Sequence, residues 1–163
     1  MLIFNCTKAA SEALTRVHKG VKVSAVKAPP NKLIEEDVQL GAGGKPIFQW
    51  VVHAIKAKRK TVLVAMDVEH RFCLFMPPLN KGDSDGFYDS FLHQMMNHMH
   101  WIGEDLQLLN ERDFQTIGEN FSEIHQQKCF YQRSDRSVLG SMKEAIWAFE
   151  ELVEDLGRVP DAE

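Results

Sequence analysis

Three groups of side chains in this sequence have types and spacings that could do chemistry, and the first is rich in histidine. On a helix, His93 and His100 share one face, and Asp89 lies on the same side. Imidazole and carboxylate groups that converge in this way are ligands for a divalent metal. The pattern therefore suggests a metal-dependent hydrolase or nuclease, while the alternative interpretation is the solvated polar face of an amphipathic helix.

The second group is a run of positive charge formed by Lys56, Lys58, Arg59 and Lys60. Such a cluster can contact the phosphate backbone of a nucleic acid. Lysine and arginine are also common in the last turn of a helix, where they complement its dipole. The run therefore indicates either a nucleic-acid-binding accessory protein or solvated charge at a helix end.

The third group opens the last predicted helix and consists of Arg136, Ser137, Gly140 and Ser141. A helix N-terminus carries free N–H groups and the positive end of the dipole, so these side chains could bind an anion. Gly140 disfavours a helix, which suggests close packing or a close backbone approach there. The alternative is ordinary capping, with Arg136 paired to a carboxylate.

The apolar pattern predicts an α+β fold with a small, mainly antiparallel sheet around a central hairpin at 61–76 and helices packed on it. Both strands of that hairpin are apolar on both faces, which is typical of a covered position. We expect helices at 46–58, 87–102 and 137–156, and strands at 2–6, 21–26, 61–67, 70–76 and 128–133.

The length of 163 residues suits one domain. Within it, 28–46 is rich in Pro, Gly and charge and is expected to form a long surface loop, and 158–163 a flexible tail. Trp147 lies opposite the apolar stripe of the last helix. We therefore expect this tryptophan to be covered by the long loop or to form a homodimer contact.

Composition excludes several classes of protein. The chain is 44% hydrophobic and 26% charged, which is typical of a folded globular domain, and its formal net charge of −4 disfavours a dedicated nucleic-acid binder. No apolar run approaches the roughly 20 residues of a membrane span. Three widely spaced cysteines, Cys6, Cys73 and Cys129, predict free thiols in a reducing cytoplasm. The sequence indicates no particular cofactor.

The chain resembles an uncharacterised family of small bacterial proteins known as a domain of unknown function. The most distinctive match is 136–142, Arg-Ser-Val-Leu-Gly-Ser-Met, where family members carry a similar Asn-Arg-Ser-Val-Leu-Gly-Ser-Met-Asn-Asp segment. This chain departs from it at Asp135, Lys143 and Glu144. The resemblance implies a single bacterial domain and supplies no activity. It draws attention to Trp50, Arg71, Arg136, Ser137, Gly140 and Ser141.

The leading hypothesis is a non-enzymatic binding or regulatory module that recognises a partner protein or a small anionic ligand. Arg136, Ser137 and Ser141 would form the site with Arg71, because donors gather there and no acid–base or nucleophile–base pair stands out in the sequence. A metal enzyme that uses His93 and His100 is favoured if these residues share a cleft with the 136–141 turn, and disfavoured if the two groups lie on opposite sides.

Overall fold

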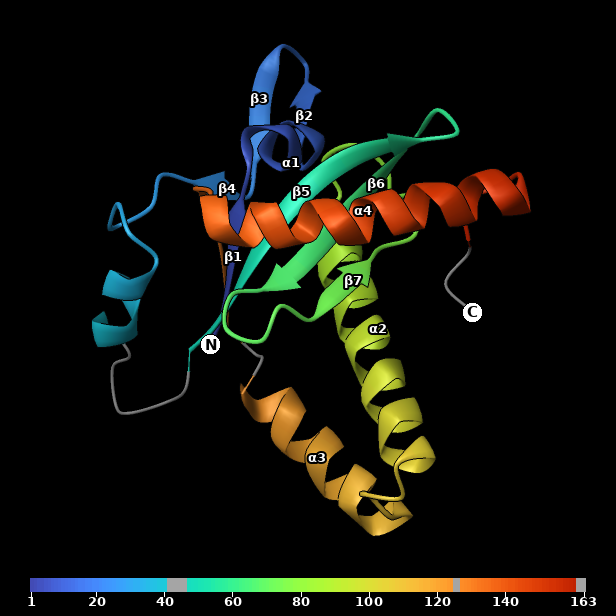
Figure 1. Cartoon of the computed structure of the whole chain (residues 1–163). Helices are drawn as coiled ribbons and strands as arrows, with labels where there is room; N and C mark the ends of the chain where they lie inside the picture. Colours follow the sequence, from blue (N-terminus) through green and yellow to red (C-terminus); the bar gives the residue numbers. More distant parts are fainter. Residues whose placement is uncertain (41–46, 125–126, 161–163) are drawn as a thin grey trace.

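The structure, a computed structural model, describes residues 1–40, 47–124 and 127–160 (Figure 1). Its helices are α1 (Lys8–Ala13), the 3-10 helix η1 (Glu35–Leu40), α2 (Ser84–Asp105), α3 (Glu111–Ile124) and α4 (Arg136–Leu156). Its strands are β1 (Leu2–Cys6), β2 (Thr15–His18), β3 (Val21–Ser24), β4 (Val26–Lys27), β5 (Phe48–Ala57), β6 (Lys60–Asp67), β7 (Cys73–Phe75) and β8 (Lys128–Gln132).

The predicted α+β fold is confirmed, but the sheet is mixed rather than mainly antiparallel. Its strand order is β4-β8-β1-β5-β6-β7, and β2 with β3 forms a separate ribbon. In the described part of this sheet, β1 pairs in parallel with β5 and β8, and β4 with β8, while β6 is antiparallel to β5 and β7. Parallel pairing requires long connections, and the segments between these strands supply them.

The predicted helix at 46–58 is wrong, because residues 48–57 form the central strand β5. The same run of apolar residues would make a helix apolar on most of its circumference or a strand apolar on both faces. Periodicity alone therefore does not distinguish the two. Trp50 and Val52 point to one face of the sheet and Val51 to the other. Three β-branched residues, Val51, Val52 and Ile55, favour the extended state.

The expected hairpin at 61–76 forms, but it does not occupy the centre of the sheet. β6 and β7 pair in antiparallel register, and β7 is an edge strand of three residues. The centre belongs to β1 and β5. The hairpin is apolar on both faces because helices cover both faces of the sheet, so its composition indicates layers rather than a central place in the strand order.

The sheet divides the core into two layers. On one face, Phe4 and Trp50 pack against Phe87 and Phe91 of α2, and α1 covers the same face through Ala10. On the other face, buried residues of β5 and β6 pack against Val138 and Met142 of α4. Figure 1 shows α4 lying across the front of the sheet and α2 behind it. Side chains on α2 and α4 are therefore separated by the sheet.

The helices α2 and α3 extend beyond the sheet as a hairpin (Figure 1). The predicted helices at 87–102 and 137–156 are confirmed by α2 and α4. Gly103 permits the turn between α2 and α3, since a Cβ there would lie 2.7 Å from the Phe114 ring and 2.8 Å from Leu109 Cδ1. None of the helices in the described part of the chain has the length and hydropathy that a membrane span requires.

The segment before β5 is anchored to the sheet by a buried polar network. Arg133, at the end of β8, forms an ion pair with Asp37 of η1 and donates to Asn5 Oδ1 from Nε at 2.9 Å and from Nη2 at 2.6 Å. Its Nη1 donates to the carbonyls of Asn31 and Leu33, both at 3.1 Å. The part of the 28–46 loop that the structure describes is thus held through buried groups.

Two neighbouring contacts complete the anchoring of this segment. Gln49 Nε2 donates to the carbonyl of Ile34 at 2.7 Å, and Ile34 is buried beside α4. At the other end of the chain, Val159 is buried against Phe149 and Val153, while residues 161–163 of the predicted tail, like 41–46 of the loop, lie outside the described residues.

We predict that Asp37→Ala destabilises the protein by about 3–5 kcal/mol, because it leaves the buried Arg133 guanidinium without its counter-charge. Urea unfolding followed by circular dichroism measures the change. Glu36→Ala is the matched control, because Glu36 is the exposed neighbour on the same turn, and its effect should stay within about 0.5 kcal/mol. Equal effects of the two substitutions would contradict a structural role for the pair.

Candidate functional site

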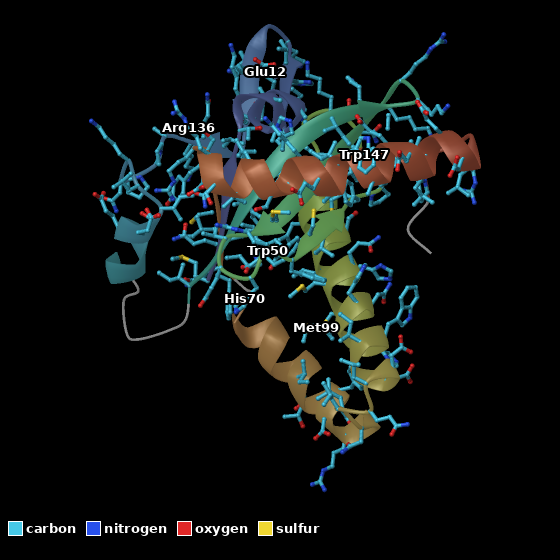
Figure 2. All side chains as sticks on the ribbon, in the orientation of Figure 1. Glu12, Trp50, His70, Met99, Arg136 and Trp147 are labelled. Atoms are coloured by element: carbon cyan, nitrogen blue, oxygen red, sulfur yellow. The ribbon has the colours of Figure 1, made fainter. Side chains whose placement is uncertain are left out.

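The structure brings Arg71 to the start of α4. Arg71 Nη2 donates to Ser137 Oγ at 3.2 Å, across 66 residues of sequence, and Nη1 donates to the carbonyl of Val68. Arg136, the residue before Ser137, is exposed at the first turn of the helix (Figure 2). We call Arg71, Arg136 and Ser137 the arginine corner. Arg71 contacts this helix N-terminus through Ser137, and Arg136 is part of its first turn.

The turn between β6 and β7 places Arg71. Asp67 Oδ2 accepts the N–H groups of Glu69, at 3.1 Å, and of His70, and it also lies 3.0 Å from His70 Nδ1. Arg71 itself has φ of 62°, in the left-handed region that side chains rarely adopt. This backbone conformation reverses the chain before β7 and is held by the Asp67 turn.

Capping occurs at the same helix end, as the alternative interpretation expected. Asp135 is the N-cap of α4, and its Oδ1 accepts the N–H of Val138 at 2.9 Å. The carboxylate satisfies one of the free donors of the first turn and adds one negative charge beside the two arginines. The corner therefore keeps a net positive charge of one from these three residues.

Gly140 and Ser141 lie one turn further along α4. A Cβ on Gly140 would have no heavy atom within 4 Å, so the predicted close packing at this glycine is wrong. Ser141 is half-buried, whereas Gly140 is exposed. The outer surface of the helix therefore has an exposed position without a side chain at Gly140, which we call the open step.

The histidine face of α2 lies on the other side of the sheet from the arginine corner. His93 Nδ1 is 3.4 Å from Asn97 Nδ2, and the His100 ring packs against the Phe114 ring at a tilt of 35°, with 4.5 Å between ring centroids. In the described residues, no group of three or more His, Cys, Asp and Glu side chains, Asp89 included, gathers to hold a metal ion. The two predicted groups do not share a cleft.

The basic run occupies the turn between β5 and β6 rather than a helix end. Lys58 and Arg59 are the two central residues of this turn, with φ of 44° and 67°. Lys56 and Lys60 flank them on the paired strands, and Lys56 Nζ donates to Thr61 Oγ1. The interpretation of these charges as a helix C-terminus is therefore wrong, because β5 is a strand.

Sequence reasoning missed a group of polar residues that form hydrogen bonds at the carboxyl ends of β1 and β8. Besides Arg133 and Asn5, Thr7 and Ser11 reach from α1 toward the sheet. Thr7 Oγ1 lies 2.9 Å from His53 Nδ1, and Ser11 Oγ donates to Gln132 Oε1 at 3.4 Å. The available signal was the single polar residue within an apolar strand, such as Asn5 in 2–6.

Thr7 Oγ1 accepts the N–H of Ala10 at 3.3 Å and also hydrogen-bonds to His53 Nδ1 at 2.9 Å. The hydroxyl group donates to Nδ1 or accepts from it according to the tautomer of the imidazole, so the contact is compatible with neutral His53. Burial lowers the pKa of His53 below its ordinary value and favours the same neutral form.

With this geometry established, the chain can be placed in a family. A family described as a domain of unknown function, DUF6933, matches residues 3–162, and the chain belongs to this family. Comparison with curated proteins found no match, and comparison with solved structures found none either. The predicted membership of an uncharacterised family is therefore confirmed.

We predict that stability decreases as pH falls from about 6.5 through the lowered pKa of folded His53. In that range the unfolded chain binds a proton that the folded chain resists, so protonation favours unfolding. His53→Gln should reduce this loss while retaining a polar partner for Thr7. Urea unfolding at several pH values between about 5 and 8 measures both proteins. If the free energy of unfolding depends on pH identically in the two proteins, His53 is not the source of the loss of stability.

Proposed function

We propose that the protein is a non-enzymatic binding module that recognises an acidic group of a partner protein at the arginine corner. The observation that carries the proposal is the bond between Arg71 and Ser137, which brings the Arg71 guanidinium group to the first turn of α4, the turn that also carries Arg136. Guanidinium groups present planar pairs of donors that match carboxylate and phosphate oxygens. The helix dipole adds to the same attraction.

The outer surface of α4 supports a protein as the carrier of that acidic group. At 100° per residue, Arg136, Gly140 and Trp147 lie on one stripe of the helix. Trp147 is 63% exposed, so the described residues of the 28–46 loop do not cover it (Figure 2). Exposed tryptophan and arginine side chains are enriched in protein interfaces. The open step at Gly140 would let a partner segment approach the helix between them.

The partners of the polar side chains also support binding rather than catalysis. The Ser137 hydroxyl accepts from Arg71, and His70, which directly precedes Arg71 in the sequence, pairs with Asp67 of its own turn. A serine nucleophile needs a neighbouring base to accept its proton. An arginine in that place offers donors to an anion instead.

We predict that Arg136→Ala and Arg71→Met each weaken binding of inorganic phosphate, the simplest probe of the corner, by about tenfold, the lower range for a lost charge-assisted hydrogen bond. Titrations followed by ¹⁵N–¹H spectra should show saturable shifts at the amides of Ser137 and Val138. Arg112→Ala on α3 removes an equal charge from an exposed site and should have no effect. An equal loss of phosphate affinity in all three variants would show that only the overall charge matters, and would contradict a site at the arginine corner.

We predict separately that Trp147→Ser weakens capture of a protein partner while leaving phosphate binding unchanged. The tryptophan contributes apolar area to an interface, whereas the phosphate probe contacts only the corner. Capture from a cell lysate by immobilised protein compares this variant with Leu152→Ser, another exposed apolar residue of α4. A partner that Arg136→Ala and Trp147→Ser both release would support the proposal. A partner retained by both variants contradicts it.

A further inference from the structure

A cavity of about 360 Å³ lies on the α1 face of the sheet, away from the arginine corner. It is bounded by α1, by the ends of β5 and β6 near their turn, and by the loop that precedes α2. The lining residues that matter for binding are Glu12, Ala13, Leu14, Lys56, Leu63 and Lys81. Its volume falls within the range of cavities that bind small molecules.

The floor of the cavity is apolar and is part of the folded core. Leu14 and Leu63 are buried, and the small side chains of Ala13 and Ala54 leave the space above them open. An apolar floor of this kind favours a ligand with an aliphatic or aromatic body, because that body leaves water on binding.

The wall formed by the loop is fixed against α1 and β2. The Gly82 N–H donates to the carbonyl of Ala13 at 2.8 Å. Gly82 has φ of 81°, and a Cβ on it would lie 2.6 Å from Arg16 Cβ, so only glycine permits this approach. The neighbouring residues Asn80 and Lys81 are therefore held beside the cavity.

The rim carries charges of both signs. Glu12 comes from α1, Lys56 from β5 and Lys81 from the loop, and all three are exposed (Glu12 is labelled in Figure 2). Within the described ranges, neither Glu12 nor Lys81 forms an ion pair. Lys56 Nζ donates to Thr61 Oγ1, which brings the ammonium group to the hydroxyl on the neighbouring strand.

We propose that this cavity binds a free α-amino acid with an apolar side chain. The carboxylate is recognised by Lys56 and Lys81, the ammonium group by Glu12, and the side chain occupies the floor formed by Ala13, Leu14 and Leu63. Because the rim carries charges of both signs, a zwitterion is electrostatically complementary to it: each charge of the ligand meets an opposite charge on the rim. The neutral groups of Asn80 and Thr61 provide additional hydrogen bonds.

The test titrates the full chain with L-leucine and L-phenylalanine and follows the amides of residues 9–14 and 79–82 in ¹⁵N–¹H spectra. Two analogues of leucine isolate each charge: 4-methylpentanoate lacks the ammonium group, and isopentylamine lacks the carboxylate. We expect at least one amino acid to bind saturably. Both analogues should bind at least about tenfold more weakly than leucine. Analogues that bind as tightly as leucine would overturn the proposal that the cavity recognises both charges of an amino acid.

Variants of the rim assign the charges. Glu12→Gln should weaken amino-acid binding by about tenfold but leave 4-methylpentanoate unchanged, since that analogue has no ammonium group to lose its partner. Lys81→Met should weaken both. Glu35→Gln, an exposed carboxylate on η1, is the control. Because all these residues are exposed, the variants should fold, and thermal unfolding confirms it.

The outcome is independent of the arginine corner. Arg136→Ala should leave amino-acid binding unchanged, and Glu12→Gln should leave phosphate binding unchanged, so that failure at one site is distinguishable from failure at the other. Absence of saturable shifts at the cavity with both amino acids, at concentrations up to about 10 mM, would overturn the proposal.

Discussion

The buried pair of Arg133 and Asp37 joins parts of the fold that the sequence keeps far apart. It connects the end of β8 to η1, and through Asn5 it connects both to the middle of β1. A buried ion pair stabilises a fold only where its remaining donors and acceptors are also satisfied. Here every nitrogen of the guanidinium group donates, Asp37 also accepts from Asn31 at 3.0 Å, and Asn5 donates onward to Gln49 at 3.1 Å. The network therefore specifies one arrangement of these segments.

The position of the candidate site depends on that arrangement. Only Ser134 and Asp135 separate Arg133 from the first turn of α4, so fixing the guanidinium group fixes where the helix begins. Ile34, which is carried by the same segment, packs beside Val138 and Met142 on the inner side of the helix. Arg71 then reaches Ser137 from the β6–β7 turn. The corner is thus assembled from a helix, a turn and a buried pair that each restrict the others.

Local pattern predicted the elements whose signals are local. The strand at 2–6, the hairpin at 61–76 and the helices α2 and α4 follow from alternation, from apolar stripes and from polar residues at helix ends. The strand β5 could not be predicted in the same way, because its apolar residues reflect burial on both faces and carry no period. Parallel pairing was also missed, since strand order is decided by contacts between distant segments.

In the candidate sites, too, the features with local signals were predicted and those that depend on contacts between distant segments were not. Arg136 and Ser137 were predicted from the helix end, and Arg71 from the family resemblance, but the bond between Arg71 and Ser137 depends on tertiary structure. Asp37 lies in a segment that reads as a surface loop, so its burial was not predictable. The cavity beside α1 is lined by Ala13 and Ala54, small residues that carry no signal of a site in the sequence.

The two candidate sites lie on opposite faces of the sheet, with the cavity on the α1 face and the arginine corner at the start of α4 on the other. Leu63 and Thr61 line the cavity, whereas Val62 and Val64, which alternate with them, are buried on the α4 side. Coupling between the sites would require the strands of the sheet to have two arrangements that each ligand stabilises differently. A paired strand that is packed on both faces resists such a change, because any shift would open voids in two layers of core at once. We therefore expect the arginine corner and the cavity to bind independently, with the sheet acting as a rigid separator rather than a transmitting element.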